Sequence, residues 1–174
     1  RLATMFSVYL IVSTFAFNYG VALPKLADVR WGDARAFGWI MATTGIGHLA
    51  GALLTARLQV VTMKWFVSAI TLLGASGIGL AFAPNVYMAY LWSLPLGLGG
   101  AAMIASGNAI SQQESPPDMR GRLLALTAVA FLGSTPIGGP ITGLIADNIS
   151  PEWSLAYGGV ITLISAAIVL IAWR

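Results

Sequence analysis

The spacing of charged residues constrains the fold of this chain more than any other feature. No Asp, Glu, Lys or Arg occurs in five long segments, residues 2–24, 36–56, 65–113, 123–146 and 153–173. A helix needs about 20 apolar residues to cross the hydrocarbon core of a bilayer, so four of these segments fit one crossing each. The segment 65–113 would extend about 73 Å as a helix at 1.5 Å per residue, so it must cross twice.

The break in that long segment is predicted at Ala83-Pro84-Asn85, a turn-forming cluster. The chain is therefore predicted to be an all-α integral membrane protein, a single six-transmembrane-helix domain over residues 1–174. No segment alternates apolar and polar residues as a membrane barrel would. Composition agrees, because 57% of the residues are hydrophobic and only 9% are charged, against about a quarter charged in soluble domains. The predicted spans are residues 2–24, 36–56, 64–82, 86–112, 123–146 and 153–173.

A signal peptide is the alternative interpretation of residues 1–24. Its apolar core would be shorter and would lead to a small-residue cleavage site, whereas this run is long enough to span and leads to Pro24 and Lys25. We therefore expect a mature helix. Because the chain starts at Arg1 and becomes apolar at once, we also expect it to be a piece of a longer protein.

The basic residues predict the orientation in the membrane. Six spans place both termini on one side, which collects six basic residues, Arg1, Arg57, Lys64, Arg120, Arg122 and Arg174. The other side has three, Lys25, Arg30 and Arg35. Cytoplasmic loops are enriched in Lys and Arg, so both termini are predicted to be cytoplasmic, in the cell (inner) membrane. Tryptophans fall at the predicted span ends, where an aromatic belt forms: Trp31, Trp65, Trp153 and Trp173.

Polar side chains are concentrated in the first, second, fourth and fifth spans. Amide and imidazole groups are costly in lipid and face a cavity or another helix. We predict that these four helices line a polar interior, and that the third and sixth face lipid or act as scaffold. The candidate substrate-binding residues in this interior are Thr14, Asn18, Thr44, His48 and Asn108.

Each of these candidates has a structural alternative. Asn18 either lines the substrate cavity or makes an interhelical hydrogen bond. His48, the one intramembrane group that titrates near neutral pH, either has a function, in proton relay or in substrate binding, or bonds a neighbouring helix. Asn108 and Gln112 lie toward the cytoplasmic end, where they line the path or tie down the following loop.

A cytoplasmic gate is the second candidate site. Its residues are Gln112, Arg120 and Arg122, in or beside the loop that leads to the fifth span. The two arginines either clamp cytoplasmic helix ends through their carbonyls or only establish topology.

Glycine and proline interrupt three of the helices, which favours either tight packing or movement. Gly47 and Gly51 in the second span have counterparts, Gly139 and Gly143, in the fifth. These pairs occupy corresponding places in two three-helix halves that run in opposite senses, and such inverted repeats are a transporter feature. The candidate packing and hinge residues are Gly47, Gly51, Pro136, Gly139, Pro140 and Gly143.

Three segments resemble the carboxy-terminal half of the major facilitator superfamily. Phe17–Pro24 (FNYGVALP) is similar to the seventh helix of its drug and siderophore exporter branch. Gln112–Arg122 (QQESPPDMRGR) resembles the loop between helices ten and eleven, and Thr135–Asp147 (TPIGGPITGLIAD) resembles helix eleven. The loop signature Gly-x-x-x-Asp-Arg is only hinted at by Gly51–Arg57.

This resemblance covers the whole chain and implies a specific fold and function. The fold would be half of a major facilitator fold, two inverted three-helix repeats. The function would be secondary active export of small lipophilic compounds or siderophores by alternating access. The partner bundle would be a missing amino-terminal six-helix half or a second copy. No carboxylate lies within a predicted span, so proton coupling would fall to His48 or to acids in the missing half.

Two other functions are alternatives for a six-helix membrane chain. Gly74-Ala75-Ser76-Gly77 resembles the nucleophile motif of rhomboid intramembrane serine proteases. A serine nucleophile needs a base within reach, and the single histidine, His48, precedes it in the chain, the reverse of the rhomboid order. A self-assembling six-helix channel is the other alternative, although no ring of charges forms a filter. We expect no enzyme, no cofactor and no metal. Cys is absent, which excludes disulfides and thiolate metal sites. We expect no nucleic-acid partner, because no basic run occurs.

Overall fold

The computed structural model describes residues 2–32 and 34–172, so Arg1, Asp33, Trp173 and Arg174 lie outside the described residues. Within the described residues there is no strand, and six helical segments are long and apolar enough to cross a membrane. The predicted all-α membrane fold is therefore confirmed. The described helices are α1 (Leu2–Ala16), α2 (Tyr19–Trp31), α3 (Ala34–Ala56), α4 (Met63–Ala81), α5 (Val86–Gln113), α6 (Arg120–Asn148) and α7 (Pro151–Ala172).

The first crossing differs from its prediction, because it consists of two helices, α1 and α2, that meet at Phe17 and Asn18. The Asn18 side chain donates from Nδ2 to the Thr14 carbonyl at 2.7 Å, so the break does not leave that carbonyl unpaired. The predicted end at residue 24 is wrong. Pro24 lies inside α2, which continues to Trp31 and ends at Gly32 in the left-handed conformation, φ 59°.

The other helix ends follow the chemistry of their caps. Thr62 begins α4 by accepting from the Trp65 backbone N–H at 3.3 Å. Asn85 begins α5 in the same way, accepting from Met88 N–H at 2.9 Å. The turn predicted at residues 83–85 thus lies between α4 and α5, where a capping side chain starts the next helix.

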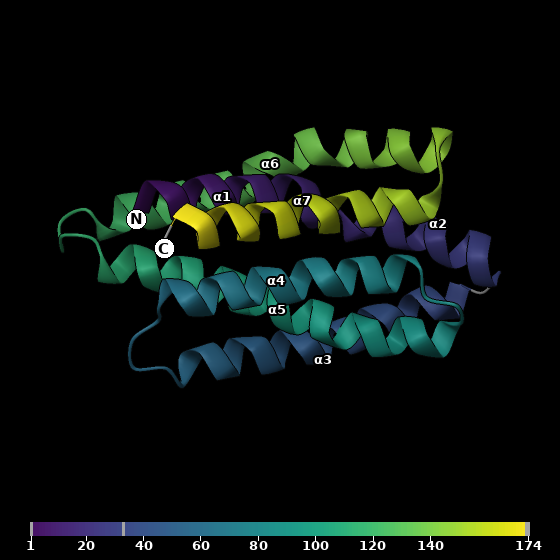
Figure 1. Cartoon of the computed structure of the whole chain (residues 1–174), viewed down its shortest axis with the longest axis horizontal. Helices are drawn as coiled ribbons and strands as arrows, with labels where there is room; N and C mark the ends of the chain where they lie inside the picture. The colour runs from purple at the N-terminus through teal and green to yellow at the C-terminus, as the bar shows by residue number, and fades with distance from the viewer. Residues whose placement is uncertain (1, 33, 173–174) are drawn as a thin grey trace.

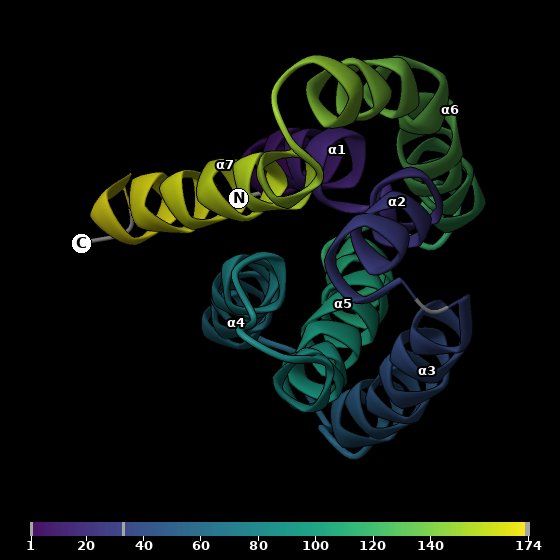
Figure 2. The same ribbon diagram turned by 90° about the vertical axis from the view of Figure 1, so that its right-hand side faces the viewer.

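The helices run roughly antiparallel along one axis (Figure 1). Both chain ends lie at one end of the bundle, together with the loops at residues 57–62 and 114–119 (Figure 1). Figure 2 looks along this axis and shows α4 and α7 on one side, α3 and α6 on the other, and α1, α2 and α5 between them. We call the end with the termini the terminal end, and the other the distal end.

Contacts between the helices follow an inverted repeat. In the first half, α3 packs on α5, and α4 packs on α5 and α7. In the second half, α6 packs on α1, and α7 packs on α1, α2 and α4. The centre of this arrangement is a reciprocal contact, since a Cβ on Gly74 would lie 2.8 Å from the Gly159 carbonyl, and one on Gly159 would lie 2.7 Å from the Gly74 carbonyl.

Two helices, α3 and α6, have a much smaller buried fraction than the other membrane-crossing segments. In the most apolar window of each span, 12% of α6 and 22% of α3 is buried, against 44–56% for the other four spans. Leu49 on α3 and Leu132 on α6 are 63% and 69% exposed. The bundle core instead lies between α1, α2, α4, α5 and α7, with Tyr9, Leu23 and Phe66 among its fully buried side chains.

Candidate functional site

The break in the first crossing lies against the middle of α5. A Cβ on Gly100 of α5 would lie 3.3 Å from Nε2 of His48 and 3.4 Å from the Phe17 ring. His48 comes from α3 and is half-buried. Glycine at position 100 therefore lets an imidazole from α3 and an aromatic ring from the break lie next to the same point of α5.

Four aromatic side chains continue from this point. The rings of Phe17 and Phe131 lie edge to face with centroids 5.1 Å apart. Phe131 of α6 is 6.2 Å from Tyr9 of α1, and Phe17 is 5.7 Å from Tyr19 of α2. These separations lie in the range of favourable aromatic pairs. We call Tyr9, Phe17, Tyr19 and Phe131 the aromatic cluster.

The aromatic cluster borders a small cavity between α1, α5 and α6. Its volume is about 260 Å³, and its lining residues carry no charge. Polar groups enter it from Asn108 of α5, which is half-buried, and from Thr127 of α6. Of the predicted substrate-binding residues, Asn108 lines this cavity, and His48 lies next to the cluster.

Two residues of this region were missed by sequence reasoning. Phe131 and Tyr9 line the cavity, although nothing in their local pattern distinguishes them from core aromatics. Gly107 is the one related feature of the sequence, a glycine within the predicted fourth span. In the structure a Cβ at this position would lie 2.8 Å from the Tyr9 ring, so the glycine makes room for Tyr9. The hydroxyl of Tyr19 is also notable, because it is buried and has no hydrogen-bond partner among the described residues.

Asn18 does not line this cavity and takes part in a polar network. Its side chain is 6% exposed. Besides its bond to Thr14, Asn18 interacts with the Tyr157 hydroxyl of α7, which lies 2.5 Å from Oγ1 of Thr142 on α6. In this conformation Asn18 therefore joins the break to α6 and α7 rather than opening into the cavity.

Thr14 and Thr44 are buried, and their hydroxyls donate to carbonyls of their own helices, Leu10 and Ile40, at 2.7 Å each. Their backbone carbonyls meet glycines of neighbouring helices. A Cβ on Gly138 would lie 1.7 Å from the Thr14 carbonyl.

The predicted packing glycines divide into two groups. Cβ atoms on Gly47 and Gly51 would lie 2.0 and 2.2 Å from carbonyls of α5, so these glycines allow α3 and α5 to touch. On α6, Gly139 and Gly143 have room for a Cβ, with nearest neighbours at 4.0 and 3.8 Å, and the close approach is made by Gly138. The two predicted prolines, Pro136 and Pro140, lie inside α6 and are exposed.

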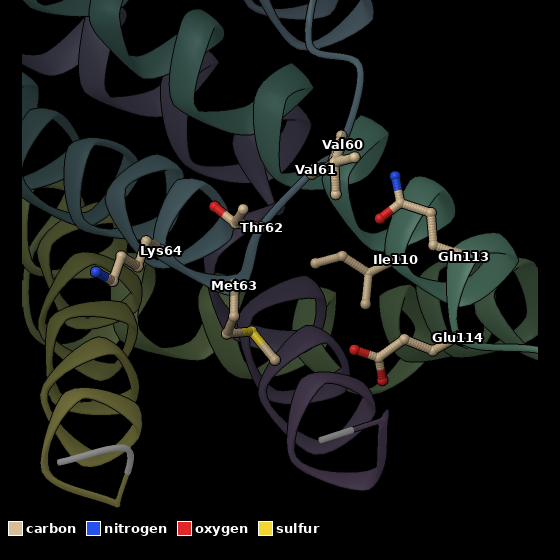
Figure 3. A pocket seen from close by; sticks show the side chains of 8 residues that line it. All are labelled: Val60, Val61, Thr62, Met63, Lys64, Ile110, Gln113 and Glu114. Carbon is tan, nitrogen blue, oxygen red and sulfur yellow. The ribbon is translucent and has the colours of Figure 1, made fainter.

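A second cavity, of about 520 Å³, lies at the terminal end between α5 and the loop before α4 (Figure 3). Gln113, oriented to satisfy both amide atoms, accepts from Val61 N–H at 3.1 Å and donates to the Val61 carbonyl at 3.0 Å. Gln112, the predicted gate residue, is exposed and donates to the Asn108 carbonyl of its own helix at 3.3 Å. Gln113 is thus the residue that holds the loop.

The predicted gate arginines are both exposed. Arg120 donates from Nε to the Ser115 carbonyl at 3.4 Å, within the loop between α5 and α6. The structure therefore connects Arg120 to its own loop, and it does not bring Gln112, Arg120 and Arg122 into one hydrogen-bonded group.

The serine of the protease-like motif is on α4. Ser76 is fully buried, and its hydroxyl donates to the Leu72 carbonyl of its own helix. This is the common use of a serine within a membrane helix. His48 lies on α3, next to α5 and the aromatic cluster.

Comparison with known proteins agrees with this architecture. The family model of the Major Facilitator Superfamily matches residues 5–174. The chain is similar to the Probable multidrug resistance protein EmrY of Escherichia coli (strain K12), with 24% identity over 136 residues. That match covers 76% of this chain and 26% of the relative, so the chain spans about a quarter of that protein's length. No solved structure matches the chain.

The family match extends over nearly the whole chain and over all six membrane-crossing segments. It is a family of transporters and not of enzymes, so the serine-protease alternative is wrong. The chain belongs to the Major Facilitator Superfamily, a family of membrane transporters.

Proposed function

We propose that the chain is one of two bundles of a secondary transporter that exports small lipophilic compounds, siderophores included, by alternating access. The observation that carries this proposal is the uncharged cavity between α1, α5 and α6 with its aromatic cluster. Apolar walls with a few polar groups are typical of small-molecule sites. The multidrug resistance named in the relative's description supports the same class of substrate.

Within this proposal, His48 and Asn108 contact the substrate, while Thr14, Asn18 and Thr44 support the packing of the surrounding helices. The half-buried positions of His48 and Asn108 support the first role. Burial of the other three and their hydrogen bonds to backbone carbonyls support the second. Gln112, Arg120 and Arg122 would act at the terminal end as the loop moves between the two access states.

The partner bundle would cover α3 and α6, the two least buried helices. It would be a missing amino-terminal six-helix half or a second copy of this chain. The relative is about four times as long as the matched segment, which favours a half within one polypeptide. Six of the nine basic residues belong to the terminal end, so both termini would be cytoplasmic.

The substrate site is tested by Phe131→Ala in the full-length protein. We expect about a tenfold loss of apparent affinity for a lipophilic aromatic dye, because an aromatic partner is removed from the cavity. The measurement is dye efflux from energised cells over a range of dye concentrations. Phe82→Ala is the matched control, since Phe82 pairs with Trp153 at the distal end, 5.6 Å between centroids. Equal loss in the two variants would place the substrate elsewhere.

His48 is proposed to contribute to proton coupling, because it is the one histidine of the chain, and no carboxylate lines the cavity or occurs within a predicted span. His48→Ala is expected to reduce the dependence of efflux on an imposed proton gradient. The measurement compares efflux with and without the gradient in vesicles that carry the full-length protein. Unchanged coupling would remove His48 from the mechanism and leave coupling to groups outside this chain.

A further inference from the structure

We propose that the wedge between α4 and α7 at the terminal end is a binding site for one anionic phospholipid, with the phosphate at Lys64 and an acyl chain along α4. This inference rests on the membrane location of the chain and not on the proposed substrate. The wedge is an open groove of about 660 Å³, and its lining includes Lys64, Val67, Ser68, Thr71, Ala75 and Leu170.

The shape of the groove follows from how the two helices cross. At the middle of the bundle, α4 and α7 touch backbone to backbone through Gly74 and Gly159. Toward the terminal end they separate, and Figure 2 shows the yellow end of α7 leading away from α4. On α4, the side chains of Ser68, Thr71 and Ala75 are small and exposed, so they leave open space along this side of the groove.

The length of the groove matches one leaflet. Lys64 and Ala75 are eleven positions apart on α4, a rise of about 16 Å. Half of the hydrocarbon core is about 15 Å thick. A chain lying in the groove would thus begin at the headgroup level and end near the midplane, where Gly74 and Gly159 close the space.

The depth of Lys64 is marked by its neighbour. Trp65 donates from Nε1 to Oγ1 of Thr55 at 3.0 Å, which fixes the indole between α3 and α4. Tryptophan at a span end is typical of the membrane–water interface. Lys64 is therefore placed at the level of lipid phosphates.

The charge of Lys64 selects the headgroup. The two ion pairs among the described residues involve Lys25 and Arg30, so Lys64 is not part of either. Figure 3 shows its ammonium pointing away from the other labelled side chains, including the carboxylate of Glu114. A basic residue at this level attracts anionic lipids.

At the distal end, the corresponding space between α4 and α7 is occupied by side chains of the chain itself. There Phe82 after α4 and Trp153 of α7 lie edge to face, 5.6 Å between centroids. The chain fills that space with its own aromatic rings. At the terminal end it places small residues and a cation instead, so an external apolar ligand with a negative headgroup fits the space.

Native mass spectrometry of the delipidated full-length protein, titrated with phosphatidylglycerol or phosphatidylcholine of identical acyl chains, tests this site. We expect tighter binding of one phosphatidylglycerol. Lys64→Gln should weaken that binding about fivefold, the size expected for one basic residue at an anionic surface. Lys64→Arg should retain it, and Arg57→Gln, at the same end but outside the groove lining, should leave it unchanged.

A second variant tests the apolar part without changing charge. Ala75→Phe should weaken binding of both lipids by filling the groove, with normal elution of the protein in size-exclusion chromatography. Equal binding of the two lipids to the wild type, or unchanged phosphatidylglycerol binding in Lys64→Gln, would overturn the proposal. A dimer that forms only when lipid is absent would assign the groove to a second copy instead.

Discussion

At the scale of single residues, the bundle depends on a few glycines whose missing side chains allow backbones to touch. Gly47 and Gly51 of α3 and Gly97 of α5 form one such seam, with hypothetical Cβ atoms 2.0–2.2 Å from backbone carbonyls. Gly138 of α6 forms another, against Thr14. Backbone atoms cannot yield as a flexible side chain does, so any added carbon must move a helix.

Two glycines on the same helix give a matched test. Gly47→Ala should destabilise the protein by about 1–3 kcal/mol, because the new carbon overpacks against the Leu94 carbonyl. Gly45→Ala should be neutral or slightly stabilising, because nothing lies within 4 Å of its Cβ position and alanine favours the helix. Thermal unfolding of the detergent-purified protein provides the comparison. A similar loss in both variants would mean that α3 does not contact α5 as described.

For these residues, the sequence alone predicted close helix packing but not the exact contact positions. Glycine pairs at a spacing of four predicted close packing, but not which turn of the helix faces a neighbour. On α6 the approach is made by Gly138, one position before the predicted Gly139. At the terminal end Gln113, and not Gln112, holds the loop. A shift of one residue turns a side chain by about 100° around a helix, and that register depends on the partner helix.

At the scale of helices, charged residues marked most ends well because they cannot enter lipid at low cost. The ends of α3 to α7 lie within three residues of the predicted span ends. The break between α1 and α2 could not be predicted in this way. It occurs at Phe17 and Asn18, where the Asn18 side chain donates to the Thr14 carbonyl and Gly138 of α6 leaves room for that carbonyl.

The half-helix α2 is also tied down at its distal end. Lys25 pairs with Asp147 at the end of α6, and Arg30 pairs with Glu152 at the start of α7, the latter with 3.4 Å between Nη1 and Oε1. Both pairs connect positions 122 residues apart. α2 thus bridges the break and the turn between α6 and α7.

Charge reversal tests this connection. Lys25→Asp should lower stability, and adding Asp147→Lys should restore it, because the pair is rebuilt with opposite polarity. The Lys25 and Asp147 side chains are 38% and 66% exposed, so solvent screening limits the coupling to about 1 kcal/mol or less. Thermal unfolding of the two single variants, the double variant and the wild type gives the coupling energy. If the losses of stability in the two single variants simply add in the double variant, the Lys25–Asp147 pair contributes nothing to the stability of the protein.

At the scale of the whole molecule, burial is distributed as expected for half of a larger bundle. α4 and α7 pack on each other, whereas α3 and α6 bury only 22% and 12% of their most apolar windows. The sequence predicted α4 and α7 as scaffold from their lack of amide and imidazole groups. It did not predict that α3 and α6 would be the exposed pair, because that depends on where helices far apart in sequence meet.

Transport by alternating access predicts counterflow, which can be measured in proteoliposomes of the full-length protein. Vesicles are loaded with an excess of unlabelled lipophilic compound and diluted into labelled compound, with no ion gradient. An alternating-access carrier exchanges one for the other, so we predict transient accumulation of label above its outside concentration. Accumulation should be reduced in Phe131→Ala and retained in Phe82→Ala. Simple equilibration of the label, with no overshoot, would contradict the account.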